Sequence, residues 1–387
     1  FNPLHYYYRW YFIYFSFPFL SLFFGYFVGA YEVNKEGINA SSLLNNSLMR
    51  PIFEHFVTIY YFIYFAVLPF FLLRSKKGID YFFKIFFIMF FLCITLGLID
   101  YALVVLFDYE LLPRHISDFR HVGKRFHGIA GEPRDAFVLL FFGIALLYLK
   151  EIWTGIKFNR ILIPLILICA LLTQSLSGFL GLLMASGLII IYQIPKMKLS
   201  YILLTIIAGS VLAIGIVLAI SNSTRVMLYI ESAPIAFEAL QNGLELPDAI
   251  MQQMNNIYPL WIRWTEIIQM NLMPSFIGTG LGTASIANGY INPEGGVLNP
   301  HANIIRVLFE SGVIGTFLYI AAFLQPCRKL SKLITRPAYL LFPMLLMIGV
   351  SFGHRSSTLY IFLGIVILVF YFKQVHETNS ENEINGT

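Results

Sequence analysis

The residues best suited to chemistry lie between Asn299 and His301, directly ahead of an apolar segment. Asparagine is a favoured helix cap and proline is favoured at the first helical position, so Asn299 and Pro300 predict a helix start. His301 then falls in the first turn, where the positive end of the helix dipole disfavours an imidazolium. A neutral imidazole can accept a proton, and free amides at the same helix end can hold an anion. The stretch predicts a general base beside an anion site; the alternative is an interfacial histidine without a chemical role.

A second group of polar residues follows on the same segment. Asn303, Arg306 and Glu310 are spaced i, i+3 and i+7, which places them on one face of a helix. Ionisable groups within a membrane span normally face the protein interior or a water-filled cavity. We expect Arg306 to pair with Glu310, and contact of Arg306 with a substrate is the alternative. Gly312 and Gly315 are expected to allow close packing against a neighbouring helix.

Further arginines could hold an anionic substrate. Arg263 lies between Trp261 and Trp264 in a segment, residues 257–273, whose periodicity predicts an amphipathic helix at the membrane interface. Arginine keeps its proton and binds phosphate oxygens in pairs through its planar guanidinium. The other residues that we expect at a pyrophosphate or glycan site are Arg120, Arg125, Arg134, Arg225, Arg306, Arg355, Glu132, Asn303 and Glu310. The alternative is that these arginines pair with nearby carboxylates or contact lipid headgroups.

The sequence predicts no metal and no cofactor. The histidines of the first long loop, His115, His121 and His127, do not have the spacing of a known metal site. The cysteines Cys93, Cys169 and Cys327 are scattered, which excludes a disulfide framework and a cysteine-based metal site. No phosphate-binding loop of a nucleotide enzyme is found, and no nucleic acid is expected as a partner.

The elements that must position these residues are membrane helices. Hydrophobic residues make up 58% of the 387 positions and charged residues only 12%, too few to cover a water-soluble surface. Apolar runs of about 20 residues exclude the alternating pattern of barrel strands. We therefore predict an all-α polytopic membrane protein with a single integral membrane domain over residues 1–387.

Hydropathy predicts ten spans. They cover residues 10–30, 55–73, 80–107, 134–149, 161–174, 177–194, 200–221, 302–325, 337–352 and 357–372. The apolar stretch 161–194 could be one long helix, but Gln174 to Gly178 interrupts it, and its length exceeds one bilayer crossing. We interpret it as a tight hairpin.

The charges predict which side each loop occupies. With ten spans, the short basic connections all fall on the side of the two termini, which the positive-inside rule assigns to the cytoplasm. The two long loops, residues 108–133 and 222–300, are then periplasmic. On this topology the outer side carries nine arginines and two lysines, whereas the inner side carries five arginines and ten lysines. The excess of arginine favours an outward site for a phosphate or pyrophosphate anion.

Five stretches agree in residues and order with one known family. They are Gly278-Thr-Gly-Leu-Gly282, Asn299-Pro-His-Ala-Asn303, Glu310-Ser-Gly-Val-Ile-Gly315, Leu172-Thr-Gln-Ser-Leu-Ser-Gly178 and Gly131-Glu-Pro133. Together they resemble the signature of the O-antigen polymerase and O-antigen ligase superfamily, whose members commonly have twelve spans. Ala302 stands where ligases usually place Asn, Ser or Gln, and it favours a polymerase.

The resemblance implies a GT-C-like, inverting glycosyltransferase of lipopolysaccharide biosynthesis in the bacterial inner membrane. It implies an oligosaccharide linked to undecaprenyl pyrophosphate as substrate, with membrane lipid, a chain-length regulator and a flippase as partners. His301 would deprotonate the acceptor hydroxyl, and arginines such as Arg263 would stabilise the departing pyrophosphate without a metal. The alternatives are a ligase that transfers the glycan to lipid A-core and a transporter of lipid-linked oligosaccharide. A transporter would be expected to show internal repeats, and none is found.

Overall fold

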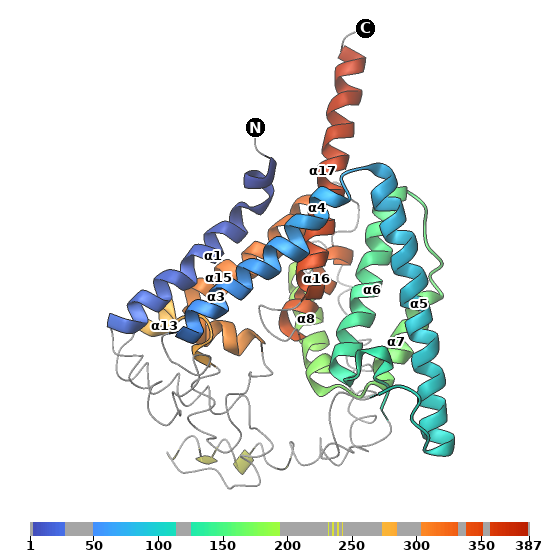
Figure 1. Ribbon diagram of the computed structural model, residues 1–387, viewed down its shortest axis with the longest axis horizontal. Helices are drawn as coiled ribbons and strands as arrows, with labels where there is room; N and C mark the ends of the chain where they lie inside the picture. The colour runs from blue at the N-terminus through green and yellow to red at the C-terminus, as the bar shows by residue number, and fades with distance from the viewer. Residues whose placement is uncertain are drawn as a thin grey trace.

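The computed structural model describes residues 3–27, 49–113, 125–193, 273–284, 303–331, 338–350 and 357–385, with a few single positions between 231 and 242. Within these ranges the chain forms helices joined by turns and short irregular connections, and the fold is that of a helical membrane protein (Figure 1). The helices are α1 (Pro3–Phe27), α3 (Met49–Tyr61), η2 (Phe62–Val67), α4 (Leu68–Leu72), α5 (Lys76–Phe107), η4 (Gly128–Ala130), α6 (Pro133–Thr154), α7 (Leu162–Leu172), α8 (Leu176–Gln193), α13 (Met273–Ile277), α15 (Asn303–Ser331), α16 (Ala338–Val350) and α17 (Ser357–Asn385).

Five helical segments of the described chain are long and apolar enough to cross a membrane. They are Met49–Leu72, Lys76–Phe107, Pro133–Thr154, Arg306–Leu330 and Ser357–Gln374. The first combines α3, the π-helical stretch η2 and α4. These segments overlap the spans predicted at 55–73, 80–107, 134–149, 302–325 and 357–372, although the prediction of one continuous helix over 302–325 is wrong, because α15 is broken at Gly312.

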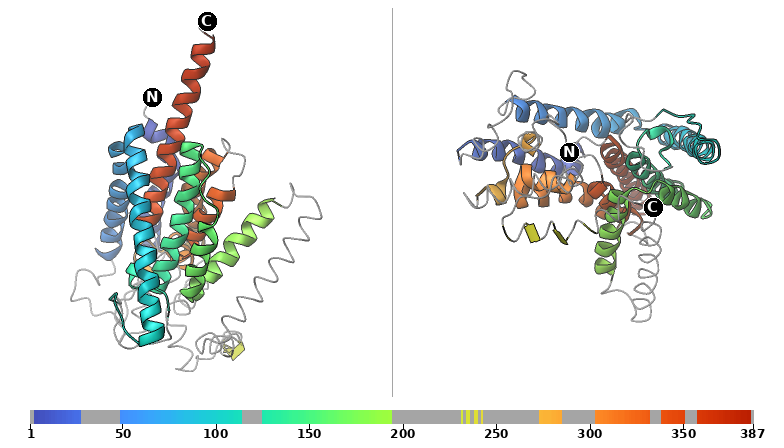
Figure 2. Two further views of the ribbon diagram at one scale, coloured as in Figure 1. Left: turned by 90° about the vertical axis from the view of Figure 1, so that its right-hand side faces the viewer. Right: turned by 90° about the horizontal axis from the view of Figure 1, so that it is seen from below.

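The other predicted spans correspond less closely to the structure. Helices α7 and α16 are apolar but short, and α1 and α8 occupy the regions predicted at 10–30 and 177–194. The span predicted at 200–221 lies outside the described residues, so the total of ten stays a prediction. The predicted interruption of the 161–194 stretch is confirmed, because α7 ends at Leu172 and α8 begins at Leu176. Helix α8 leans away from the rest of the bundle (Figure 2).

The helices alternate in direction between the two ends of the bundle. The junction between α4 and α5 contains Arg74, Lys76 and Lys77, and it lies at the same end as both chain termini (Figure 1). We call this the basic end. The C-terminus of α5, the start of α6, and α13 lie at the opposite end. This alternation agrees with the predicted topology, in which the basic end faces the cytoplasm.

Aromatic side chains join α1 to the centre of the bundle. The Tyr8 hydroxyl donates a hydrogen bond to the carbonyl oxygen of Ala66 (2.9 Å), within the π-helical stretch η2. The ring of Tyr11 stacks on Phe62 with centroids 4.0 Å apart, and its hydroxyl lies 2.8 Å from the hydroxyl of Tyr360 in α17. Burial of aromatic rings with satisfied hydroxyls is a strong stabilising contribution. These contacts fix α1 against η2 and α17.

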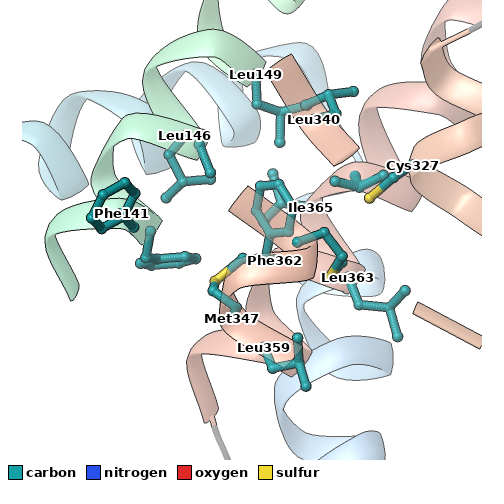
Figure 3. Packing of buried hydrophobic residues seen from close by; sticks show 14 of the residues in the cluster. Phe141, Leu146, Leu149, Cys327, Leu340, Met347, Leu359, Phe362, Leu363 and Ile365 are labelled. Atoms are coloured by element: carbon teal, nitrogen blue, oxygen red, sulfur yellow. The ribbon is translucent and has the colours of Figure 1, made fainter. Parts of the chain in front are cut away.

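Aliphatic side chains, phenylalanines and small residues fill the remainder of the core. Helices α6, α15, α16 and α17 meet around Leu146, Cys327, Met347 and Phe362, all of which are buried (Figure 3). Between α5 and α6, the Phe90 ring occupies the space beside Gly143, where a Cβ atom would collide with the ring. Close packing of this kind leaves no room for an added methyl group.

We therefore expect Gly143→Ala to destabilise the protein by about 1–3 kcal/mol, because overpacking forces a buried ring out of its position. Thermal unfolding in detergent micelles would measure the loss. The matched control is Gly187→Ala in α8, where a Cβ would meet no atom within 4 Å. Adding Phe90→Leu to Gly143→Ala should recover part of the stability, and equal unfolding midpoints for Gly143→Ala and Gly187→Ala would contradict this account of the packing.

Candidate functional site

A glycine-rich turn follows α13 at the end of the bundle opposite the basic end. Gly278, Gly280 and Gly282 have φ angles of 87°, 105° and 82°, which side chains with a Cβ rarely adopt. The turn lies against α15, because the amide of Gly280 donates to the carbonyl of Glu310 at 2.8 Å and the amide of Thr279 donates to Phe309 at 3.2 Å. Two stretches that carry the family resemblance are therefore in direct backbone contact.

Helix α15 is broken at Gly312, whose φ of 64° and ψ of −171° are not helical. A Cβ at this position would collide with the backbone at Phe276 and Ile277 of α13. A helix break deprives the preceding carbonyls of their usual donors, and the amides of the glycine-rich turn supply replacements. The expected close packing of Gly312 and Gly315 is confirmed, with Gly315 lying against Phe17 of α1.

The break folds the first part of α15 back on the second. Asn303 donates a hydrogen bond from Nδ2 to the hydroxyl of Tyr319 (3.1 Å), although 16 residues separate the two. In a straight helix these residues would lie about 24 Å apart. Asn303 also donates to the carbonyl of Ile348 in α16 (2.9 Å) and is fully buried. These contacts of Asn303 hold the segment 303–311 against the second part of α15 and against α16. We call residues 303–311 the folded-back segment.

Four charged side chains, of which Glu54, Arg306 and Glu310 are buried and Arg50 is partly buried, form a group between the folded-back segment and α3. Arg306 contacts Glu310 through Nε at 3.0 Å and Glu54 through Nη2 at 3.7 Å, and Arg50 lies 3.5 Å from Glu54. Arg306 is 1% exposed, Glu54 2% and Glu310 0%, so the charges are almost completely removed from solvent. We call Arg50, Glu54, Arg306 and Glu310 the ion cluster, and its formal charges sum to zero.

Electrostatics explain why the ion cluster takes this composition. A buried charge is tolerated only when an opposite charge and hydrogen bonds compensate for the lost hydration. The predicted pairing of Arg306 with Glu310 is confirmed, and Glu54 is a second carboxylate that the sequence analysis did not assign. The only sequence signal for it was the spacing i, i+4 of Arg50 and Glu54 at the start of an otherwise apolar segment. The Glu54 side chain also lies against Gly282 of the glycine-rich turn.

The Leu172–Gly178 stretch of the resemblance contacts the segment before α6 at the C-terminus of α7. Arg125 donates from Nε to the carbonyl of Thr173 (3.1 Å) and from Nη2 to that of Gln174 (2.8 Å), and the amide of Phe126 donates to Leu172 (2.9 Å). A cation is favourable at a helix C-terminus, where carbonyls lack donors. Arg125 thus joins the α7–α8 connection to the segment before α6, and Gly178 lies against Phe137 of α6.

A buried histidine–aspartate pair fixes the same loop segment to α5. His127 Nε2 lies 3.3 Å from Asp100 Oδ2, and His127 Nδ1 lies 2.8 Å from the carbonyl oxygen of Gly128. Asp100 Oδ1 accepts hydrogen bonds from the amides of Leu111 and Leu112, both at 2.8 Å. A carbonyl oxygen only accepts, so the contact with Gly128 places a hydrogen on Nδ1. The pair was not predicted, since His127 was considered only as a possible metal ligand.

The structure places the predicted site residues unevenly. Asn303, Arg306 and Glu310 are together in the folded-back segment, whereas Arg125 lies at the end of α7. Arg134 lies beside Glu132 (4.0 Å) and Asp135 (3.8 Å) at the start of α6. For Arg134 and Arg306, this is the predicted alternative of pairing with carboxylates. The remaining predictions lie outside the described residues: His301, Arg263, Arg120, Arg225, Arg355, His115, His121 and the interfacial helix 257–273.

Comparisons of the chain with protein-family models, with curated proteins and with solved structures find no match.

Removal of one member of the ion cluster should destabilise the protein, because it leaves a buried charge without compensation. Glu54→Gln leaves the two arginines of the ion cluster with one carboxylate in the protein interior. Such a change typically lowers the free energy of unfolding by about 3–5 kcal/mol. The matched control is Glu151→Gln, because Glu151 pairs with the partly exposed Arg160 at 2.9 Å and its loss should cost less than about 1 kcal/mol. The double variant Arg50→Gln/Glu54→Gln restores neutrality and should regain part of the loss. Similar unfolding midpoints for Glu54→Gln and Glu151→Gln would contradict this assignment.

The Asp100–His127 pair allows a second test. Asp100→Leu removes the acceptor for two amides and the partner of a buried imidazole, so we expect a loss of about 3 kcal/mol or more. Asp100→Asn keeps an acceptor and can donate to a neutral His127, so it should cost clearly less. Denaturant titration followed by tryptophan fluorescence would compare them, and equal losses would show that the hydrogen-bond network does not matter.

Proposed function

We propose that this protein is a membrane-embedded glycosyltransferase that polymerises polysaccharide repeat units, of O-antigen or exopolysaccharide type, on the periplasmic face of the inner membrane. The donor would be a glycan on undecaprenyl pyrophosphate, and the acceptor would be the terminal sugar of a second lipid-linked repeat. The observation that supports this most is the meeting of the glycine-rich turn with α15 at Glu310 and Gly312. These stretches carry the family resemblance and lie at the end predicted to face outward.

The proposed chemistry is a direct displacement at the anomeric carbon. His301 accepts the proton of the acceptor hydroxyl while the hydroxyl oxygen forms the new bond to the anomeric carbon. The bond from the anomeric carbon to the pyrophosphate oxygen breaks at the same time, and undecaprenyl pyrophosphate leaves as an anion. Arginine side chains hold the developing charge. Displacement from the opposite face inverts the configuration, and no metal or other cofactor takes part in this scheme.

The described residues have a positioning role in this proposal. The folded-back segment begins two residues after His301, and it is fixed by Asn303 at one end and by the ion cluster and Gly312 at the other. A catalytic base must be held to within a fraction of an ångström, since small displacements lower rates by large factors. Because Arg306 contacts two carboxylates, pyrophosphate binding is assigned first to Arg263, with Arg120, Arg225 and Arg355 as further candidates.

The favoured acceptor is another lipid-linked repeat, as in a polymerase. A ligase would use the same donor and the same displacement with lipid A-core as acceptor, and Ala302 favours the polymerase. A transporter is disfavoured because the buried charged groups of the described chain lie toward one end of the helices and not in a row through the bundle.

His301→Ala and Arg263→Ala test the proposal in reconstituted vesicles with purified lipid-linked repeat. Each should reduce chain extension and release of undecaprenyl pyrophosphate by at least about 100-fold, the usual effect of removing a general base or an anion-stabilising group. The control is Arg160→Gln at the basic end, which removes an arginine far along the chain from the site and should leave the rate unchanged.

The outcomes separate the alternatives. Full activity of His301→Ala and Arg263→Ala, with unfolding midpoints equal to that of the parent, would remove the site assignment. Transfer to lipid A-core but not to a lipid-linked repeat would identify a ligase. Movement of the glycan across the bilayer without release of undecaprenyl pyrophosphate would identify a transporter.

A further inference from the structure

A groove lies between α5 and α6 at the basic end, far from the glycine-rich turn. It has a volume of about 420 Å³, within the usual range of small-molecule sites, and α5 and α6 supply all its lining residues. The groove opens on the outer surface of the bundle, where Lys84 and Ile88 are exposed. In a membrane this surface of α5 faces lipid, because only 28% of the most apolar 18-residue stretch of α5 is buried inside the protein.

The lining changes from polar to apolar along the groove. On α5, Asp80 and Lys84 lie nearest the basic end, and Phe87, Ile88 and Phe91 follow on the same face toward the middle of the helix. This face extends about 10 Å from Lys84 to Phe91. Helix α6 runs in the opposite direction and ends at Thr154, so its lining residues Lys150 and Thr154 also lie at the basic end. A phospholipid in the leaflet at that end has the same order of polarity.

The two lysines of the groove lie at the depth expected for lipid phosphates. Helix α5 has 32 residues and is about 48 Å long, so it exceeds the hydrocarbon thickness of about 30 Å and must extend into a headgroup layer. Lys84 is the last charged residue before an uncharged run, 85–99, and Lys150 directly follows the uncharged run 136–149 of α6. Both ammonium groups therefore mark the boundary between hydrocarbon and headgroups.

The charge of the groove favours an anion. Neither Lys84 nor Lys150 forms an ion pair within the described part of the chain, and the Lys150 ammonium lies 5.3 Å from the centroid of the Phe87 ring. Asp80, the only carboxylate of the lining, accepts a hydrogen bond from the Trp153 indole at 2.8 Å. The lining thus carries a net charge of +1 beside an apolar wall.

We infer that this groove binds one anionic phospholipid from the leaflet at the basic end. Lys84 and Lys150 contact the phosphate, and an acyl chain lies along Phe87, Ile88 and Phe91. Basic pockets between membrane helices bind anionic headgroups by this combination of charge and apolar contact. The site is separate from the proposed transferase site and does not depend on that function.

Native mass spectrometry of the full chain from detergent, titrated with phosphatidylglycerol, tests the inference. Lys84→Gln/Lys150→Gln should weaken the binding of the first lipid by about thirtyfold, on the basis of about 1 kcal/mol for each lysine near a lipid phosphate. The control Lys76→Gln/Lys157→Gln removes the same charge from exposed positions at the same end but outside the groove, and its affinity should stay within about threefold of the parent. Ile88→Gln keeps both lysines but makes the apolar wall of the groove polar, so it should also weaken lipid binding.

Three results would overturn the inference. One is an equal loss in the two double variants, which would indicate a general surface potential. Another is equally tight binding of phosphatidylcholine by the parent. The third is displacement of the lipid by inorganic phosphate at equal concentration, which would indicate a phosphate site without a part for the acyl chain. Unchanged unfolding midpoints of all variants without added lipid confirm that each comparison is made on folded protein.

Discussion

The arrangement at the glycine-rich end depends on a guanidinium that has almost no contact with water. Arg306 is 1% exposed, and one carboxylate on its own helix does not suffice to compensate for the hydration that it loses. Glu54 of α3 supplies the second carboxylate and Arg50 restores neutrality, so α3 and α15 are obliged to approach each other at this depth. The requirement for charge compensation thus links two helices that are about 250 residues apart in the sequence.

Backbone constraints act together with this electrostatic one. The bend at Gly312 brings the folded-back segment beside Tyr319, and the glycine-rich turn supplies donors to the carbonyls that the bend leaves without helical partners. Non-helical backbone within membrane proteins is tolerated where protein groups satisfy it, and such places often carry function. The three positive φ angles of the turn and the one at Gly312 explain why glycine stands at these positions.

Sequence patterns predicted the local features of this structure well. The lengths of the apolar runs predicted the positions of the long helices, and the interruption from Gln174 to Gly178 predicted the break between α7 and α8. The spacing i, i+4 predicted the Arg306–Glu310 pair. Long-range contacts were not predictable in the same way. Nothing in the spacing relates Glu54 to Arg306 or Asp100 to His127, because such pairs follow from the packing of whole helices.

The bend in α15 was also missed, and it changes the assignment of one predicted span. The interval 302–325 reads as a continuous apolar helix, and only the φ angle of Gly312 reveals that its first nine described residues run in another direction. Periodicity reports which residues share a face of one helix but contains no information on where that helix turns. Among the predicted substrate arginines, Arg125, Arg134 and Arg306 are engaged with carbonyls or carboxylates of the protein.

The break at Gly312 has a consequence for how the chain enters the membrane. The helix beyond it, residues 313–331, is roughly 28 Å long, which matches one hydrocarbon layer, and its charged residues lie only near its C-terminal end. Insertion of this helix therefore does not require Arg306 or Glu310 to cross lipid. The charges of the folded-back segment are instead compensated by α3, and its carbonyls are satisfied by the glycine-rich turn, so their burial depends on contacts between helices and not on lipid.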